Sequence, residues 1–265
     1  MEAQHSFIDA LFSLKGRVAL VTGGNGGLGK GIALGLRAAG ATPIVTGRNL
    51  EKNKSVAQEL TDSGMVLELD VRNEYAVERA VARVIKEFGR LDILVNNAGT
   101  FRGGPAVELS LEDWNTVLDV HLTGAFLCSK YAARAMTEAG NGGKIINIGS
   151  VFSFYGHAKG PDYATAKAGI IGLTRSLAIQ LRDSNIQVNA ILPGWFETDM
   201  TKGLPSTPRG EDIRRRTPAG RFGTPEDLVG AAVFLASAAS NFVTGTYIAV
   251  DGGYLISDRP LHDEN

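Results

Sequence analysis

The sequence is poor in the residues from which disulfide frameworks and zinc sites are built. Its 265 residues include a single cysteine, Cys128, and four scattered histidines. One cysteine excludes an internal disulfide, and without a Cys/His cluster at zinc spacing we predict no metal site. This cysteine usage fits a reducing compartment, so we expect a cytoplasmic location.

Excess charge and long apolar runs are also missing. The chain has 27 basic and 28 acidic residues and a net charge of -1, so it carries no basic footprint for nucleic acid and no polybasic membrane signal. Residues 1–16 include Glu2, Asp9 and Lys15 and lack a continuous apolar core, and no later run is long enough to cross a membrane. We therefore expect neither a nucleic-acid nor a membrane partner.

Short apolar runs alternate with segments of helical period along the whole chain. The predicted strands are residues 17–22, 42–46, 65–69, 91–95, 144–148, 187–192 and 246–250. This alternation predicts an α/β fold, a doubly wound parallel sheet with helices on both faces and a site at the carboxyl ends of the strands. We expect a single domain over residues 1–265, with an N-terminal extension at 1–13 and a frayed polar tail at 257–265.

A glycine-rich turn follows the first predicted strand and opens a helix. Glycines let the backbone approach a pyrophosphate closely, and the helix N-terminus offers unpaired N–H groups. This context predicts a Rossmann-type nucleotide site, with an ordinary tight turn as the alternative. The predicted contacts are Gly23, Asn25, Gly27, Leu28 and Gly29.

The ends of the next strands bear on the choice of cofactor. The second strand ends at Gly47-Arg48, where NAD-dependent folds usually place an acid for the ribose 2′-hydroxyl and NADP-dependent ones accept an Arg. This favours NADP, although an Arg48 that only stacks over adenine or faces solvent leaves NAD usable. Asp70 follows the third strand and is a candidate for the adenine amino group or for a helix cap.

The pair Tyr163-x-x-x-Lys167, preceded by Ser150, is the strongest chemical signal. Residues four apart share one helix face, so the phenol and the ammonium are expected to lie together. Using a tyrosine as a proton donor near neutral pH requires stabilising its phenolate by about 3 pKa units, or ~4 kcal/mol. A Lys charge about 4 Å away supplies roughly that much. The alternative is a core Tyr with a wet tip and a solvated surface Lys.

Residues 199–222 are rich in Gly, Pro, Thr and charge and show no clean period, which predicts a substrate loop or lid. Within it, Arg214-Arg215-Arg216 is either a solvated face or attracts an anionic substrate into the cleft. Nearby aromatic residues are predicted to line the substrate pocket. They are Phe152, Phe154, Tyr155, His157, Trp195 and Phe196.

Taken in order, these motifs resemble the short-chain dehydrogenase/reductase family over residues 14–256. The matching segments are Thr22-Gly23-x-x-x-Gly27-x-Gly29, Asn96-Asn97-Ala98-Gly99, Ser150 with Tyr163-x-x-x-Lys167, Pro193-Gly194 and Val250-Asp251-Gly252-Gly253. The resemblance implies hydride transfer between nicotinamide C4 and a carbonyl or alcohol carbon. It assigns the acid/base role to Tyr163, the substrate oxygen to Ser150, and both the lowered tyrosine pKa and the nicotinamide ribose to Lys167.

The resemblance also implies cofactor contacts beyond the glycine turn and a homotetramer built through two long helices and the C-terminal strand. Asp70 and Val71 would lie at the adenine, Asn97 near the ribose and Thr198 at the carboxamide; Ala98, Gly99, Pro193 and Gly194 complete the predicted cofactor set.

One position departs from the family pattern. His121 stands on the inward side of a predicted long helix where the family normally carries an Asn that helps hold a water in a proton relay. A His can also donate, accept and shuttle protons near neutral pH. The relay therefore survives in altered form, or His121 is a structural residue packed against Val117 and Ala125.

The sequence leaves several functions open. The segments 12–20, 47–49 and 218–221 are similar to sugar-acid members such as gluconate 5-dehydrogenase and 2-deoxygluconate 3-dehydrogenase. A 3-oxoacyl carrier-protein reductase is the alternative, for which residues 209–216 would supply a basic docking surface, and the aromatic pocket would also suit a cyclic ketone. A cofactor-binding sensor or scaffold without turnover is the non-enzymatic alternative.

Overall fold

A computed structural model describes residues 2–60 and 64–258, and within them seven parallel strands form one sheet. Its spatial order is β3-β2-β1-β4-β5-β6-β7. The strands are β1 (Val18–Thr22), β2 (Thr42–Gly47), β3 (Met65–Glu68), β4 (Ile93–Asn96), β5 (Gly143–Ile148), β6 (Ile186–Pro193) and β7 (Tyr247–Val250). The order reverses between β1 and β4, which is where ligands bind in open α/β sheets.

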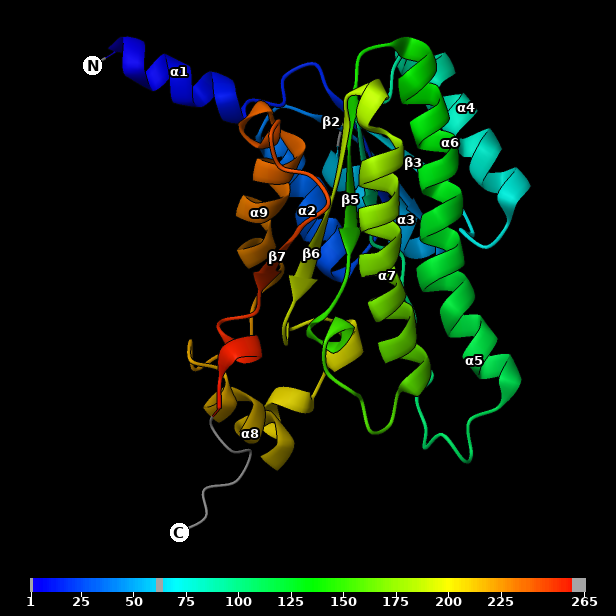
Figure 1. Cartoon of the computed structure of the whole chain (residues 1–265), viewed down its shortest axis with the longest axis vertical. Coiled ribbons are helices and arrows are strands. Elements are labelled where there is room, and N and C mark those ends of the chain that lie inside the picture. Colours follow the sequence, from blue (N-terminus) through cyan, green and yellow to red (C-terminus); the bar gives the residue numbers. More distant parts are fainter. Residues whose placement is uncertain (1, 61–63, 259–265) are drawn as a thin grey trace.

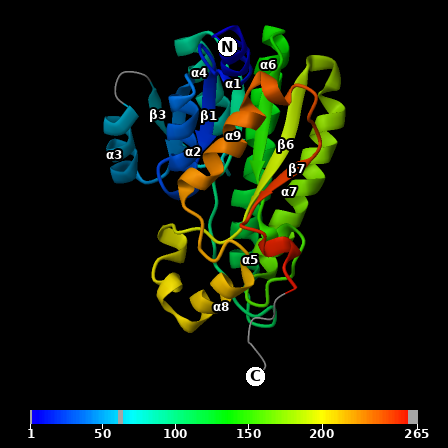
Figure 2. The same ribbon diagram turned by 90° about the vertical axis from the view of Figure 1, so that its left-hand side faces the viewer.

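Helices cover both faces of this sheet (Figures 1 and 2). On one face lie α2 (Gly27–Ala38), α3 (Leu50–Leu60) and α9 (Val229–Ala236); on the other lie α4 (Glu74–Phe88), α6 (Gly124–Ala139) and α7 (Pro161–Gln180). Strands β1 and β4 are buried at every position, as expected for short apolar runs covered on both faces. The predicted doubly wound fold is confirmed.

The helix predicted around His121 is not continuous. It consists of α5 (Leu111–Leu118), a π-helical turn over Asp119–Thr123 and then α6. A π-helical turn inserts one extra residue per turn and commonly marks a functional site. Here it contains the buried residues Val120 and His121.

The segment 199–222 is more ordered than its composition suggests. It contains the helix α8 (Pro208–Arg216), which Thr207 caps by accepting a hydrogen bond from the Gly210 backbone N–H. The helix lies beyond the carboxyl ends of β5 and β6 (Figures 1 and 2), and so stands over the predicted site. The sequence shows no clean period here because caps and local ion pairs, rather than an apolar period, specify the helix.

The two predicted terminal segments differ in what the structure describes. Within the N-terminal extension, Glu2–Phe12 form helix α1, and Phe12 meets Phe234 of α9 with ring centroids 6.5 Å apart. The predicted polar tail from residue 259 onward and the helix end at 61–63 lie outside the described residues.

Candidate active site

A cavity of about 690 Å³ lies at the carboxyl ends of the strands and collects almost every predicted site residue. Its lining combines the glycine turn with the ends of β2, β3, β4, β5 and β6. The predicted residues in its wall are Gly23, Asn25, Gly27, Leu28, Arg48, Asp70, Val71, Asn97, Ala98, Gly99, His121, Ser150, Phe152, His157, Tyr163, Lys167, Pro193, Gly194, Trp195, Phe196 and Thr198. Of the predicted cofactor contacts, Gly29 does not line it.

Gly29 has a packing role in the glycine turn rather than a place in the cavity wall. A Cβ atom at this position would lie 2.2 Å from Asn97 Nδ2 and 2.5 Å from the Gly23 carbonyl oxygen. The Asn97 amide donates to the carbonyl oxygens of Thr22 and Gly23, at 2.9 and 3.0 Å. Asn97 therefore holds the turn in shape, in addition to facing the cavity.

The turn suits a pyrophosphate. Gly23 and Gly27 adopt left-handed backbone angles, with φ of +61° and +50°, which favour glycine. Gly26 is the N-cap of α2 and makes no side-chain cap, and Gly26, Gly27 and Leu28 line the cavity, so the first N–H groups of the helix are available to a ligand there. These residues fit a dinucleotide cofactor.

The residues at the end of β2 affect whether the cavity can accept a cofactor that carries a phosphate on its ribose. A Cβ atom at Gly47 would lie 2.1 Å from Asn25 Nδ2, and that amide is held by donating to Asn53 Oδ1 at 2.7 Å. An acidic side chain at position 47 would thus collide with Asn25. The exposed Arg48 guanidinium instead faces the cavity, 3.9 Å from Asp70 Oδ2.

Asp70 is held by its neighbour Arg72. Its carboxylate accepts from Arg72 Nη2 at 2.6 Å and Nε at 3.0 Å, and this hydrogen bonding keeps the Asp70 pKa below its usual range despite partial burial. The alternative role as a helix cap is wrong, because Asn73 caps α4 by accepting from the Ala76 backbone N–H.

Ser150, Tyr163 and Lys167 meet at the centre of the cavity wall. Ser150 follows β5, and Tyr163 and Lys167 lie one turn apart near the start of α7. The Lys167 ammonium is buried, lies 5.6 Å from the Tyr163 ring centroid and donates to the Ile148 carbonyl oxygen at 2.7 Å. The alternative of a solvated surface lysine is therefore wrong.

The protonation of this pair differs from the simple expectation. Burial lowers the pKa of Lys167 to about 7, and burial raises the pKa of Tyr163, opposed only by a hydrogen bond with Ser150. The expected lowering of the Tyr163 pKa by Lys167 is not found, because the buried amine is itself poorly able to hold its charge. Both groups can exchange a proton, but Lys167 is the one that titrates near neutral pH.

His121 reaches the cavity from the π-helical turn. Its ring meets the Tyr163 ring edge-on, with centroids 5.2 Å apart, and its Nε2 lies 2.7 Å from the Thr100 carbonyl oxygen. The Thr100 backbone N–H also lies 3.1 Å from Nε2, but the carbonyl contact is the shorter one and a carbonyl only accepts, so we assign the proton to Nε2. Burial lowers the His121 pKa to about 3, so the ring is neutral, and its buried Nδ1 has no hydrogen-bond partner within the described residues.

Aromatic rings form the other end of the cavity. Phe152 lies 4.4 Å from the His157 ring and 5.8 Å from the Trp195 ring, measured between centroids. Phe101 contacts both His157 and Tyr163 and was not predicted, although its place two residues after the Asn96–Gly99 strand end puts it at the same edge of the sheet.

Two aromatic residues were wrongly assigned to the pocket. Phe154 is half exposed and packs against Tyr247, and Tyr155 packs against Tyr254 and donates to the Leu255 carbonyl oxygen. Neither lines the cavity. The short helical turn over Val151–Ser153 directs them toward the C-terminal segment, which a sequence pattern does not reveal.

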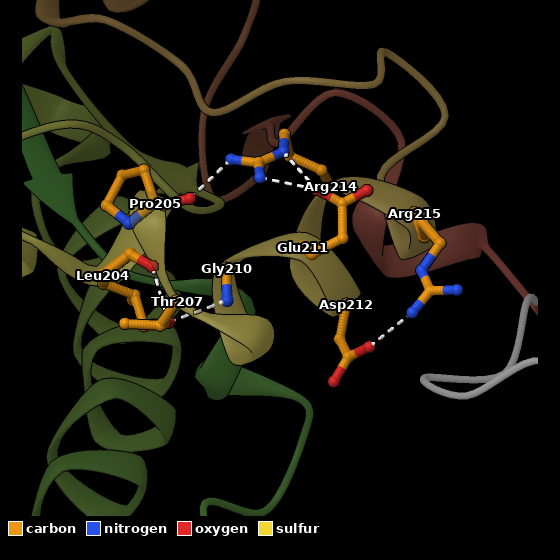
Figure 3. A network of polar contacts seen from close by, with 8 residues as sticks. All are labelled: Leu204, Pro205, Thr207, Gly210, Glu211, Asp212, Arg214 and Arg215. Carbon is orange, nitrogen blue, oxygen red and sulfur yellow. Dashed lines mark hydrogen bonds and ion pairs between the residues drawn. The ribbon is translucent and has the colours of Figure 1, made fainter.

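The arginine run 214–216 also lies outside the cavity wall. Arg214 pairs with Glu211 and Arg215 with Asp212 (Figure 3). Arg216 lies over the rings of Tyr155 and Tyr254, at 5.1 and 4.6 Å from their centroids. These three arginines are therefore not part of the cavity wall; Arg209, earlier on the same helix, lines the cavity instead.

Known proteins share this fold and much of this sequence. A family model described as Enoyl-(Acyl carrier protein) reductase matches residues 23–255. The chain is 44% identical over 248 residues to 2-dehydro-3-deoxy-D-gluconate 5-dehydrogenase of Escherichia coli (strain K12), covering 92% of this chain and 97% of that protein. It is 41% identical over 244 residues to 3-oxoacyl-[acyl-carrier-protein] reductase FabG of Aquifex aeolicus (strain VF5), covering 91% and 98%.

A solved structure that is similar to this chain is also a sugar-acid dehydrogenase. The gluconate 5-dehydrogenase of Burkholderia cenocepacia J2315, in complex with NADP and tartrate, is 38% identical with a TM-score of 0.89, covering 93% of this chain and 98% of that one. The fold and the cavity thus define an NAD(P)-dependent oxidoreductase acting on CH–OH groups. The chain belongs to the short-chain dehydrogenase/reductase family, as the motifs predicted.

The structure also bears on metals and membranes. Among residues 2–60 and 64–258, no three or more His, Cys, Asp or Glu side chains are grouped so as to hold a metal ion. Within the same ranges, no helix combines the length and the apolar character needed to cross a membrane.

Proposed function

We propose that this protein is an NADP-preferring dehydrogenase that interconverts a secondary alcohol and a ketone on a sugar acid or another small polar substrate. The observation that carries the proposal is the meeting of Ser150, Tyr163 and Lys167 with the glycine turn in one cavity. The names of the sugar-acid relatives support the substrate class. Family membership argues against a sensor without turnover.

The proposed chemistry assigns each polar group one task. The nicotinamide, when bound, exchanges a hydride with the reacting carbon. Tyr163 passes a proton between its hydroxyl and the substrate oxygen, and Ser150 holds that oxygen by a hydrogen bond. Lys167, whose pKa is about 7, exchanges protons with its surroundings during turnover and orients the cofactor ribose.

His121 takes a positioning role in this proposal. With its protonated Nε2 tied to Thr100, the buried Nδ1 is left as an acceptor that has no partner among the described residues. An acceptor there stabilises a proton donor, such as a water hydrogen-bonded to Lys167, as an Asn carbonyl would. The relay thus survives with a neutral imidazole in place of an amide.

The NADP preference rests on the end of β2. Gly47 leaves no room for an acid, and the Arg48 guanidinium faces the cavity. The solved gluconate 5-dehydrogenase of B. cenocepacia contains NADP. Tighter binding of NADH than of NADPH in a direct titration would contradict this preference.

The test of the reaction follows the absorbance of reduced nicotinamide with D-gluconate and NADP⁺ and, in the reverse direction, with a 5-keto sugar acid and NADPH. A 3-oxoacyl thioester and a cyclic ketone represent the second candidates, which the 41% identity to a 3-oxoacyl reductase and the aromatic end of the cavity support. Turnover of the sugar acid that disappears in Tyr163→Phe is expected. Turnover of the thioester alone would replace the first candidate by the second.

We also propose a cytoplasmic homotetramer of single-domain chains spanning residues 1–265. Large apolar side chains stand exposed on α6, α7 and the edge strand β7, namely Phe126, Ile179 and Tyr247. A subunit interface over these elements would cover them. Light scattering that gives a monomer mass at micromolar concentration would contradict the tetramer.

A further inference from the structure

The cavity has an uneven distribution of charge. Its lining contains two acids, Asp70 and Asp199, and both lie at the cofactor end, where Asp70 pairs with Arg72 and Asp199 with Lys52. At the aromatic end the lining contains no acid but two cations, Lys159 and Arg209. Asp162, outside the lining, also acts on His157, but the two cations still outnumber this one acid, so the aromatic end carries net positive charge.

We propose that Arg209, assisted by Lys159, is the binding site for a carboxylate of the substrate. The proposal rests on the dehydrogenase function above and names the group that the substrate must carry. It places the anion at the aromatic end of the cavity, away from the glycine turn and Arg48.

The position of Arg209 relative to the reacting centre supports this site. Its guanidinium carbon lies 5.5 Å from the Trp195 ring centroid. Trp195 is next to Phe152, and Phe152 lies 6.2 Å from the Tyr163 ring. Successive ring contacts through Trp195 and Phe152 thus link Arg209 to Tyr163 within the wall of one cavity.

The stacking also prepares the guanidinium for binding. A ring against its face leaves the N–H groups free along the edge, where they match the two oxygens of a carboxylate. The His157 ring lies nearby, since the charge of Arg209 contributes, after burial, to lowering the His157 pKa. His157 Nδ1 accepts from the Lys159 backbone N–H, so the neutral ring carries its proton on Nε2 and adds a donor for a substrate hydroxyl.

Arg209 differs from the other arginines of its helix. Arg214 and Arg215 are neutralised by Glu211 and Asp212 on α8 itself (Figure 3). Arg209 has no acidic partner within salt-bridge distance among the described residues, and its guanidinium lies at the rim of the cavity. Its charge therefore remains available to a ligand.

The test compares D-gluconate with D-glucitol, which has the same carbon chain with an alcohol in place of the carboxylate. Both are titrated calorimetrically into enzyme saturated with NADPH, a pairing in which both partners are reduced and no hydride moves. Arg209→Gln is expected to weaken gluconate binding by about tenfold or more, the usual loss of a hydrogen bond to a charged group. Arg209→Lys should lose less, and glucitol and NADPH binding should stay within about twofold.

The matched control is Arg215→Gln, which removes the same charge from the same helix outside the cavity and should leave gluconate binding unchanged. The inference is overturned if wild-type enzyme binds gluconate no better than glucitol, or if Arg209→Gln binds gluconate as wild type does. Gluconate binding that depends on Arg209, without oxidation by NADP⁺, would support the carboxylate site while excluding gluconate as the substrate of the proposed reaction.

Discussion

The Asn25 amide occupies the space that any side chain at Gly47 would need, since a Cβ atom there would lie 2.1 Å from Asn25 Nδ2. Asn25 is in turn fixed by its hydrogen bond to Asn53. The position from which an acid would bind the ribose 2′-hydroxyl is therefore closed by a neighbour from the glycine turn. A charged side chain for the ribose 2′ position therefore comes from the next residue, Arg48, rather than from position 47.

Arg48→Gln should weaken NADPH binding by about tenfold, because a charge-assisted contact with the ribose phosphate is lost. NADH binding should change by less than about twofold, since NADH lacks that phosphate. Fluorescence titration with both cofactors measures the two constants. Lys54→Gln is the control, as Lys54 is an exposed cation of α3 paired with Glu51. Equal losses for both cofactors would show that Arg48 contacts the adenine rather than the phosphate.

Tyr163→Phe should lower kcat by about a hundredfold to ten-thousandfold, the range spanned by general acid–base catalysis. The ring contacts with His121 and Phe101 survive the loss of the hydroxyl, so NADPH binding should remain within about twofold of wild type. Steady-state kinetics and a cofactor titration on the same preparation separate the two effects. A variant with substantial turnover would assign the proton transfer to another group.

The lowered pKa of Lys167 predicts how the free energy of unfolding depends on pH. Its pKa is about 7 in the folded chain and 10.5 in the unfolded reference. Between these values the unfolded chain holds the proton and the folded chain does not, so stability rises with pH across this window. Below about pH 7 the buried charge exerts its full destabilising effect.

Wild type should gain stability relative to Lys167→Met as the pH rises from about 7 to about 9, by at most ~1.4 kcal/mol per pH unit. Urea unfolding of both proteins across this range measures the difference. A difference that is independent of pH would show that the Lys167 pKa is not lowered.

His121→Asn should keep the pH profile of kcat/KM between about pH 5 and pH 8, because the wild-type imidazole, with a pKa of about 3, does not titrate there. His121→Leu removes the buried acceptor and should lower kcat by about tenfold or more without changing NADPH binding. An acidic limb near pH 6.5 that is present in wild type and absent from His121→Asn would contradict a neutral His121.

Gly29→Ala should disturb the glycine turn, since its Cβ would lie 2.2 Å from Asn97 Nδ2 and 2.5 Å from the Gly23 carbonyl oxygen. We expect a loss of about 1–3 kcal/mol in the free energy of unfolding and weaker NADPH binding. Gly230→Ala is the matched control, because a Cβ there meets no atom within 4 Å. It should be neutral or stabilise α9 by about 0.5–1 kcal/mol. Equal effects of the two substitutions would refute the packing argument.

The local sequence pattern was sufficient to predict those features that depend on a single segment of the chain. The apolar runs at 18–22 and 93–96 must be buried on both faces, so they predict central parallel strands. The glycines after β1 and the spacing of Tyr163 and Lys167 likewise depend only on backbone freedom and helix period. The amino-acid pattern alone therefore places these features correctly.

Other features depend on partners distant in the chain. Arg209, Arg214, Arg215 and Arg216 are chemically alike and lie within one short helix, yet only Arg209 lines the cavity. The neighbouring acids and the rings of Tyr155 and Tyr254 decide this, and the two tyrosines come from other segments. The helical period of the sequence does not distinguish Arg209 from the other three arginines.

The sequence by itself determined the order of strands and helices, the glycine turn and the identity of the Ser150, Tyr163 and Lys167 group. Tertiary structure decided the protonation of that group, since burial of Lys167 brings its pKa to about 7. It also decided that His121 enters the site from a π-helical turn and that the Asn25 side chain fills the space beside Gly47. Propensity and period act between neighbours in the chain, whereas desolvation and steric exclusion arise only when distant segments pack together.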